Sequence, residues 1–176
     1  MKPPQKGVAL HFRTGDVYQK IYYPFHDKFF IWKKKDLEWI IQNILIFEDI
    51  LIKSSINIAR IKSIHPDNQN SRIHIFQERI SGNTLEDLLK NDLENNIDLC
   101  YSLFHLVHDV TKSKNAYIDL NLSNFIIDPK RNLYLVDLTP PLLISSVERP
   151  SNMLQECYFY LCFNIETQIY ELLCNI

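Results

Sequence analysis

Glycine is scarce in this sequence, which has only three glycines among 176 residues. A loop that wraps its backbone around phosphate groups needs several glycines close together, and no stretch here offers them. The four cysteines show no Cys-x-x-Cys spacing, so their pattern predicts neither a zinc site nor a redox site. The N-terminus has no signal-peptide pattern, and no apolar run approaches the ~20 residues of a membrane-spanning helix. We therefore expect a cytoplasmic protein with reduced thiols.

The sequence also has little net charge, only −2 at pH 7. This balance gives no electrostatic reason to expect binding to nucleic acid or to an anionic membrane. Hydrophobic residues nevertheless make up 46% of the chain, which is enough to bury a sizeable core. The length fits one domain or two small lobes that share a cleft.

The most informative stretch runs from residue 117 to residue 141. It predicts a loop that carries Asp119 and Asn124, followed by two short apolar strands that form a hairpin and end at Asp137. The predicted strands are Phe125–Ile127 and Leu133–Val136, around a turn over Asp128–Asn132. Such a hairpin would bring Asn124 and Asp137 close together. Two carboxylates and an amide at one point would suit a reacting hydroxyl and a Mg²⁺ ion, which prefers oxygen ligands.

Apolar periodicity predicts the elements outside this stretch. Leucine and isoleucine recur at helical spacing over Asp36–Lys53, which indicates a long amphipathic helix. A capped helix is expected to start near Asn83, and another amphipathic helix covers Ile97–Thr111. The remaining predictions are strands over Gly7–Phe12 and Val17–Tyr23, an extended or irregular segment over Ile56–Ile64, a loop over His65–Asn70, a strand over Arg72–Ile80, and helices within Met153–Leu173.

Glu48 falls inside the apolar stripe of the first long helix. Because an unpaired buried carboxylate is costly, we expect a cationic partner from a neighbouring element, unless Glu48 lies at a rim and stays hydrated. The opposite side of this helix carries Trp39, Ile46 and Ile50. This second apolar side suggests a protein partner or a homodimer.

Asp119-x-x-x-x-Asn124 followed by Asp137 resembles the catalytic loop and the metal-binding Asp of the protein-kinase-like superfamily. The pattern is most similar to aminoglycoside and choline phosphotransferases and to the minimal RIO-type atypical kinases. Two departures stand out. Tyr117-Ile118 replaces the usual His-Gly before the catalytic Asp, and Thr139 replaces the Gly of Asp-Phe-Gly.

The resemblance implies an α+β fold, namely a minimal two-lobed protein-kinase-like fold. Residues 1–80 would form an N-lobe with a small sheet and one long helix, and residues 81–176 a reduced, mainly helical C-lobe with the catalytic hairpin. The implied cofactors are ATP and Mg²⁺. Asp119 would orient and deprotonate a hydroxyl, while Asn124 and Asp137 would hold Mg²⁺.

The resemblance also implies nucleotide-binding residues in the N-lobe. Lys20 would contact the phosphates and form an ion pair with Glu48, and the backbone around Glu78 and Ile80 would read the adenine edge. Without the resemblance, Lys20 is explained as an edge-strand charge that favours solubility. Residues 78–80 would then be a plain strand-to-helix connection.

We therefore expect an ATP- and Mg²⁺-dependent phosphotransferase that acts on a hydroxyl of an unidentified small molecule or protein. The alternative is a kinase-like pseudoenzyme that serves as a nucleotide-binding or regulatory module. Three features favour this alternative: few residues ahead of Gly7 for a phosphate-covering loop, the missing His-Gly pair, and a short region after Asp137. A purely structural α+β adaptor is a third interpretation.

Overall fold

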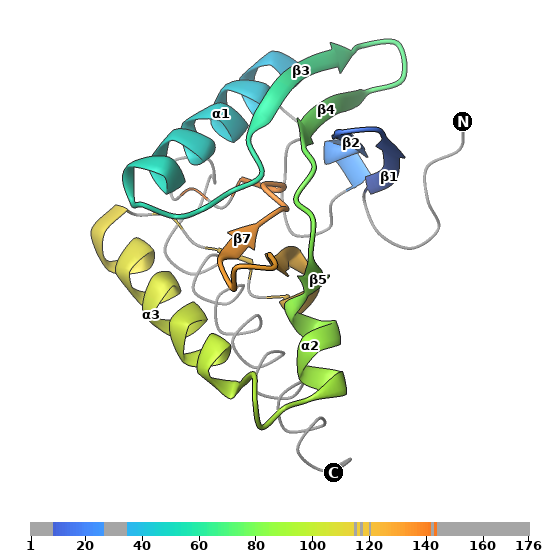
Figure 1. Cartoon of the computed structure of the whole chain (residues 1–176). Coiled ribbons are helices and arrows are strands. Elements are labelled where there is room, and N and C mark those ends of the chain that lie inside the picture. Colours follow the sequence, from blue (N-terminus) through green and yellow to red (C-terminus); the bar gives the residue numbers. More distant parts are fainter. Residues whose placement is uncertain are drawn as a thin grey trace.

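The computed structural model describes residues 9–26, 35–114, 116, 118, 119, 121–141 and 143. Within these residues the fold is α+β, with two small antiparallel sheets and three α-helices (Figure 1). The helices predicted within Met153–Leu173 lie outside the described residues. In chain order the elements are β1 (Ala9–Thr14), β2 (Val17–Tyr22), η1 (Pro24–His26), α1 (Leu37–Lys53), β3 (Ile61–Asp67), β4 (Arg72–Glu78), β5 (Asn83–Thr84), α2 (Leu85–Asn91), α3 (Ile97–Lys114), η2 (Leu122–Asn124), β6 (Phe125–Ile127) and β7 (Leu133–Leu135).

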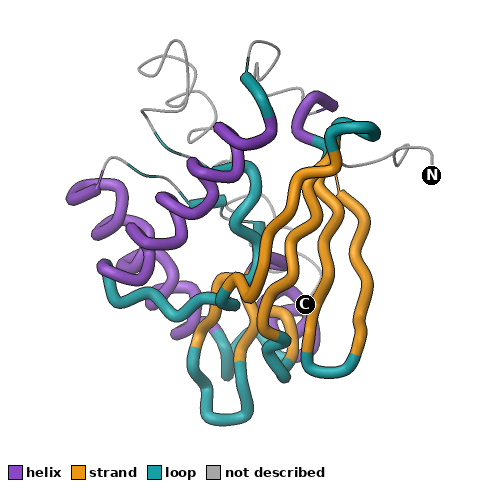
Figure 2. The backbone as a smooth tube through the Cα atoms, turned by 90° about the horizontal axis from the view of Figure 1, so that it is seen from above, coloured by secondary structure: helices purple, strands orange, loops and turns teal. Residues whose placement is uncertain are grey.

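The first sheet has the strand order β1-β2-β4-β3, and all neighbouring strands are antiparallel. β1 and β2 form the predicted hairpin around a two-residue turn at Gly15 and Asp16, where Gly15 has a φ of 59° that favours glycine. Figure 2 shows the strands of this sheet as one layer, with the long helices to one side. This arrangement leaves β3 at an edge of the sheet.

β3 begins within the segment predicted to be extended or irregular and continues into the predicted loop. The loop prediction over His65–Asn70 is wrong in its first half, because β3 continues to Asp67 and Pro66 pairs with Ile73 of β4. Proline lacks a backbone N–H, so it is tolerated in a strand mainly at a sheet edge. The edge position of β3 therefore explains why Pro66 does not end the strand.

α1 confirms the predicted long helix. Its N-cap is Asp36, whose Oδ1 accepts a hydrogen bond from the backbone N–H of Trp39 at 2.7 Å. Ile40 and Ile44 are fully buried and belong to a hydrophobic cluster shared with β4. That cluster consists of Tyr22, Leu37, Ile40, Ile41, Ile44, Ile73 and Ile75.

A second cluster forms the larger core and includes residues from both halves of the chain. Phe47 and Leu51, at the C-terminal end of α1, pack in it together with residues of α2, α3, β6 and β7. Ile58 also forms a parallel bridge with Leu135 of β7. The segment after α1 therefore lies against the second sheet, although it precedes β3 and β4 of the first.

The second sheet, in the order β5-β6-β7, contains the predicted β6–β7 hairpin. The Asp128 side chain closes its turn by accepting hydrogen bonds from the backbone N–H groups of Lys130 at 2.9 Å and Asn132 at 2.8 Å. β5 joins this sheet just before α2, and the N-cap of α2 is Thr84, which accepts from the backbone N–H of Asp87 at 3.0 Å. The helix therefore begins one residue later than an Asn83 cap would place it.

The linker between the sheets approaches β6 closely at Gly82. An added Cβ atom at Gly82 would lie 2.1 Å from the backbone oxygen of Ile127, and the φ of Gly82 is 155°. Only glycine fits such a close approach in this backbone conformation. This contact fixes where the chain passes from the first sheet to the second.

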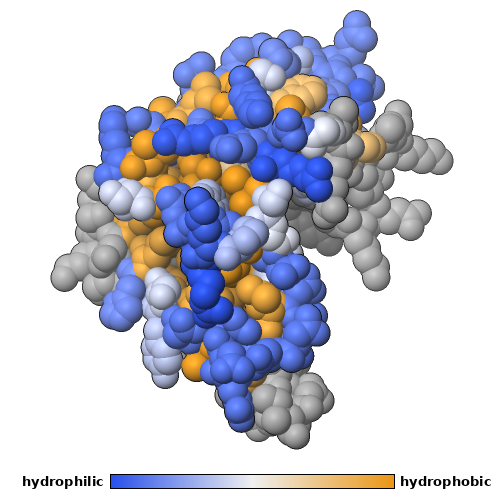
Figure 3. Space-filling view, in the orientation of Figure 1, coloured by the Kyte–Doolittle hydropathy of each residue, from blue (hydrophilic) through white to orange (hydrophobic). Residues whose placement is uncertain are grey.

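The outer surface is mixed. On the face in Figure 3, polar residues are spread over the whole described surface, with apolar residues visible between them. Of the three residues on the second apolar side of α1, Trp39 and Ile50 pack partly against the cores, and Ile46 is 50% exposed. Within the described residues, no helix is both long and apolar enough to cross a membrane.

Candidate functional site

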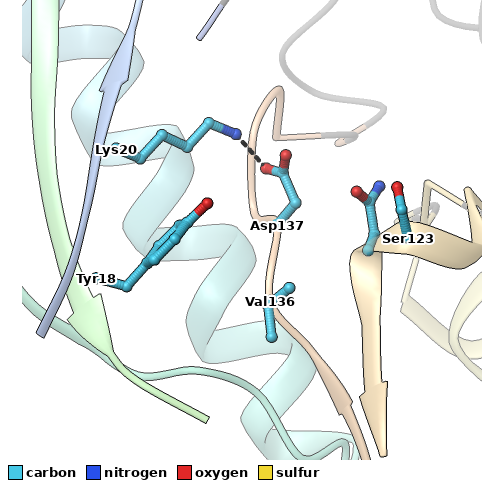
Figure 4. A pocket seen from close by; sticks show the side chains of 6 residues that line it. Tyr18, Lys20, Ser123, Val136 and Asp137 are labelled. Atoms are coloured by element: carbon cyan, nitrogen blue, oxygen red, sulfur yellow. Dashed lines mark hydrogen bonds and ion pairs between the residues drawn. The ribbon is translucent and has the colours of Figure 1, made fainter. Parts of the chain in front are cut away.

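An ion pair joins the two sheets at the centre of the molecule. Lys20 on β2 extends toward the residue after the β6–β7 hairpin, and its Nζ lies 2.5 Å from Oδ1 of Asp137 (Figure 4). The Lys20 side chain is 3% exposed and that of Asp137 is 23% exposed. A buried ammonium group is costly without a counter-charge. The pair therefore ties β2 to the end of the hairpin.

The two carboxylate oxygens of Asp137 have different surroundings. Oδ1 accepts hydrogen bonds from Lys20, from the backbone N–H of Thr139 at 2.8 Å and from the Thr139 hydroxyl at 3.1 Å. Among the residues that the structure describes, none donates a hydrogen bond to Oδ2. Within the described part of the chain, one oxygen of this largely buried carboxylate is therefore open to a ligand.

The loop before β6 is held by a chain of short-range hydrogen bonds. Asp119 Oδ1 accepts from the backbone N–H of Asn121 at 3.0 Å, and Asn121 Oδ1 accepts from the backbone N–H of Ser123 at 3.1 Å and from its hydroxyl at 2.9 Å. The backbone N–H of Val136 donates to the carbonyl of Asn124 at 2.9 Å. This last bond places Asn124 beside the start of the segment that carries Asp137, as the predicted hairpin requires.

The pKa values of Asp119 and Asp137 are displaced in opposite directions. Burial raises the pKa of Asp119, and the negative charge of Asp137 adds to the rise, although neighbouring amides and the charge of Lys20 partly oppose it. Burial alone would also raise the pKa of Asp137, but the charge and hydrogen bond of Lys20, with the hydrogen bonds from Thr139, bring that pKa below its ordinary value. Two nearby carboxylates with separated pKa values suit different chemical tasks.

A pocket of about 250 Å³ lies where these elements meet. Figure 4 shows Tyr18 and Lys20 on the β2 side, and Val136, Asp137 and Ser123 on the hairpin side. The volume is below the ~300–1,000 Å³ of pockets that take drug-sized ligands, and most of the lining side chains are polar. The lining residues are Tyr18, Lys20, Ser123, Asn124, Val136 and Asp137. A small, charged pocket of this kind suits a charged group rather than a large apolar ligand.

The predicted ion pair between Lys20 and Glu48 is wrong. Lys20 pairs with Asp137, and a carboxylate oxygen of Glu48 instead accepts a hydrogen bond from the backbone N–H of Ile61 at 2.8 Å. Glu48 is half-buried, and the cationic partner expected for it is replaced by a neutral backbone N–H. The donor comes from the first residue of β3, which lies beside α1 in the fold.

The backbone groups of the segment predicted to read adenine differ in their hydrogen bonding. The N–H of Glu78 donates to the carbonyl of Arg60 at 2.8 Å, so this group is engaged within the sheet. The next residue, Arg79, donates its N–H to the carbonyl of Asp16 at 3.2 Å. Ile80 has no backbone hydrogen bond to any described residue, and neither Glu78 nor Ile80 lines the pocket.

Three further residues of the pocket region were not predicted to be functional. Tyr18 lies two residues before Lys20 on the same strand, so alternation alone places both side chains on one face. Ser123 precedes Asn124 in the loop, and Thr139 donates two hydrogen bonds to Asp137. The spacing to Lys20 was a usable signal for Tyr18, whereas Thr139 was noted only as a departure from Asp-Phe-Gly and not as a hydrogen-bond donor.

The residues at this site fit a hard cation. No group of three or more His, Cys, Asp or Glu side chains in the described part of the chain could hold a metal ion by itself. Mg²⁺, however, is commonly bound through one or two protein oxygens together with substrate phosphates and water. The open Oδ2 of Asp137 and the amide of Asn124, which line the same pocket, match this type of site.

Comparison with known proteins supports the fold. No protein-family model matches the sequence, and no curated protein matches it. Among solved structures, a co-crystal structure of WbdD with the kinase inhibitor LY294002 is similar over 91% of this chain, with a TM-score of 0.51 and 16% sequence identity. A second structure, of the bifunctional kinase-methyltransferase WbdD, matches over 88% of the chain with a TM-score of 0.48 and 15% identity.

The chain spans 37% of the first WbdD structure and 34% of the second. At 16% identity, the similarity to the first structure shows the fold alone. Together with the element order and the two small sheets, it identifies the fold as minimal and kinase-like.

Proposed function

We propose that the protein is a kinase-like phosphotransferase that moves the γ-phosphoryl group of ATP to a hydroxyl acceptor and uses Mg²⁺. One observation carries the proposal. A buried ammonium group, a carboxylate with one open oxygen and an amide line a single small pocket, although they come from separate segments of the chain. The kinase-like fold supports this proposal at the level of architecture.

The residues divide into ligand-binding roles. Asn124 and the open Oδ2 of Asp137 are the oxygen ligands suited to Mg²⁺. When bound, Mg²⁺ would neutralise negative charge on the phosphates. Lys20 would add a second positive charge, because an ammonium group has three donors and Asp137 uses one of them. The Lys20–Asp137 pair is therefore compatible with binding a phosphate oxygen.

Asp119 is suited to handling the proton of the acceptor. Its Oδ1 is occupied by the backbone N–H of Asn121, which orients the carboxylate. Burial raises its pKa above the ordinary value, which makes it a better proton acceptor than an ordinary Asp. Asp119 would thus hold the acceptor hydroxyl and take up its proton, which leaves the oxygen free to attack phosphorus.

A specific observation favours the second candidate, a nucleotide-binding or regulatory module without catalysis. Glu48 does not hold Lys20 in place, so the orientation of Lys20 depends on the same carboxylate that is proposed to bind Mg²⁺. The replacement of His-Gly by Tyr117-Ile118 points the same way. Both candidates require binding of Mg²⁺ and nucleotide, and they differ only in transfer.

Thermal unfolding with and without Mg-ATP tests the binding that both candidates share. At a ligand concentration of about 100 Kd, binding should stabilise the folded protein by ~2.7 kcal/mol, which is about 5–11 °C in Tm for a domain of this size. Asp137→Ala and Asn124→Ala should abolish the shift. Asn124→Ala is needed because Asp137→Ala also breaks the ion pair with Lys20. Asn91→Ala, at an exposed position on α2, should keep the full shift.

Labelled ATP separates the two candidates. Wild-type protein should transfer label to acceptors in a cell extract, and Asp119→Asn should lose transfer while it keeps the thermal shift. Retained shift without transfer in the wild type would support the binding module. Absence of any shift with Mg-ATP would refute both.

A further inference from the structure

Tyr18 occupies a defined end of the pocket. On β2 it shares a face with Lys20, and both side chains line the pocket (Figure 4). Lys20 lies opposite Ile75 of β4, whereas Tyr18 lies opposite Gln77, near the end of that strand. Along β2, Tyr18 is therefore on the side of Lys20 that faces the linker between the two sheets.

Of the two pocket-lining residues on β2, Tyr18 is the nearer to the linker. None of the linker residues 79–82 lines the pocket, although they follow β4 directly. At about 250 Å³, it is also small for a ligand with both a base and a phosphate chain. On the hairpin side, Val136 is the apolar lining residue, and the others at that end are Ser123, Asn124 and Asp137.

The first backbone N–H groups at the linker are bonded within the protein. The N–H of Glu78 is bound to Arg60, and Arg79 donates its N–H to Asp16 and its guanidinium Nη1 to the carbonyl of Gly15, both at 3.2 Å. These bonds attach the start of the linker to the turn between β1 and β2. The N–H groups of Glu78 and Arg79 are thus engaged within the protein and are not presented to a base, whereas Ile80 has no backbone hydrogen bond to any described residue.

We propose that Tyr18 closes the pocket toward the linker, so that the site recognises its donor by the Mg²⁺–polyphosphate group and does not select the base. The inference rests on the proposed function, because it concerns the same pocket. Its ligand class is the Mg²⁺ complex of a polyphosphate chain, which ATP, GTP and inorganic tripolyphosphate all provide. The buried charge of Lys20 and the open oxygen of Asp137 supply the recognition.

The opposing interpretation is that the Tyr18 ring stacks on a base. Stacking of a base on an aromatic side chain contributes ~1–3 kcal/mol, which is about 5- to 150-fold in Kd. If Tyr18 stacks, ATP binds the wild type more tightly than tripolyphosphate by such a factor, and removal of the ring lowers that preference. If Tyr18 closes the pocket, removal of the ring raises the preference for ATP over tripolyphosphate.

Titration calorimetry on the full chain decides between these interpretations. We expect Mg-ATP, Mg-GTP and Mg-tripolyphosphate to bind the wild type with Kd values within about threefold of each other. In Tyr18→Ala, the preference for ATP over tripolyphosphate should increase by about tenfold, while tripolyphosphate binds as before. Tyr101→Ala, which removes a tyrosine that is 66% exposed on α3, is the matched control and should change nothing.

Each result has a definite meaning. A wild-type preference for ATP above about tenfold overturns the inference and leaves the proposed function intact. Failure of all three ligands to bind refutes the proposed function and the inference with it. If Tyr18→Ala does not fold, the wild-type comparison still decides, and Tyr18→Leu serves as the second variant.

Discussion

The ion pair between Lys20 and Asp137 yields the sharpest prediction. Asp137→Asn keeps the size of the side chain but removes its charge, and it leaves the ammonium group of Lys20 buried at 3% exposure without a counter-charge. Breaking a buried pair in this way typically costs ~3–5 kcal/mol. For a domain of this size, that cost corresponds to a fall in Tm of about 6–20 °C.

A double-mutant cycle measures the pair itself. Lys20→Met removes the other charge, and Lys20→Met/Asp137→Asn should be less destabilised than the sum of the single variants, because neither charge is then left alone. We expect a coupling energy of ~2–3 kcal/mol, near the upper end of the range for residues in contact. Denaturant unfolding at pH 7, followed by circular dichroism, provides the four free energies of unfolding.

The control is a second ion pair with similar geometry and little burial. Asp49 and Lys53 on α1 are 2.6 Å apart, with side chains 55% and 69% exposed. The equivalent cycle on this pair should yield only ~0.3–0.5 kcal/mol. A Lys20–Asp137 coupling as small as that of the control would refute the reasoning, because it would mean that the buried pair does not form in solution.

The coupling should also depend on pH in a definite direction. The folded-state pKa of Asp137 is lowered, so the stability that the pair contributes is fully present above the ordinary value of 3.8. It is lost as the pH falls through the lower folded-state value. A coupling energy that is already lost near neutral pH would contradict the assigned charge state of Asp137.

Further predictions concern four other residues. Asp119→Asn should raise the Tm at pH 7, because the pKa of Asp119 is raised in the folded state and its ionised carboxylate is therefore destabilising at a pH above that value. Thermal scans at several pH values should show this gain in Tm disappearing below pH 3.8, the ordinary pKa of the group. Gly82→Ala should cost well over 1 kcal/mol in denaturant unfolding, since its Cβ would lie 2.1 Å from a backbone oxygen. Gly15→Ala, whose Cβ meets nothing within 4 Å, should lose only ~1 kcal/mol from its positive φ. Glu48→Ala should lower the free energy of unfolding by ~1 kcal/mol, because one hydrogen bond is lost. The affinity for Mg-ATP should stay within about threefold of the wild type. A larger loss of affinity would restore the predicted role of Glu48.

Local patterns in the sequence predicted most of the secondary structure. The helical spacing of isoleucine and leucine predicted α1, and the structure adds that Asp36 caps it. The Asp128–Asn132 turn predicted the β6–β7 hairpin, because its side chains bond to backbone groups only a few residues away. The boundary of β3 was missed, since the tolerance of Pro66 depends on its place at the sheet edge.

By itself, the sequence determined the local elements and the hairpin that places Asn124 beside the strand leading to Asp137. Their causes, namely periodicity, caps and turns, act over a few residues. Only the tertiary structure decided the partner of Lys20, which lies 117 positions away in the sequence. It likewise decided that Glu48 bonds to Ile61 and that Tyr18 lines the same pocket as Asp137. A buried charge requires a partner wherever the fold brings one, and spacing along the chain does not specify which segment will supply it.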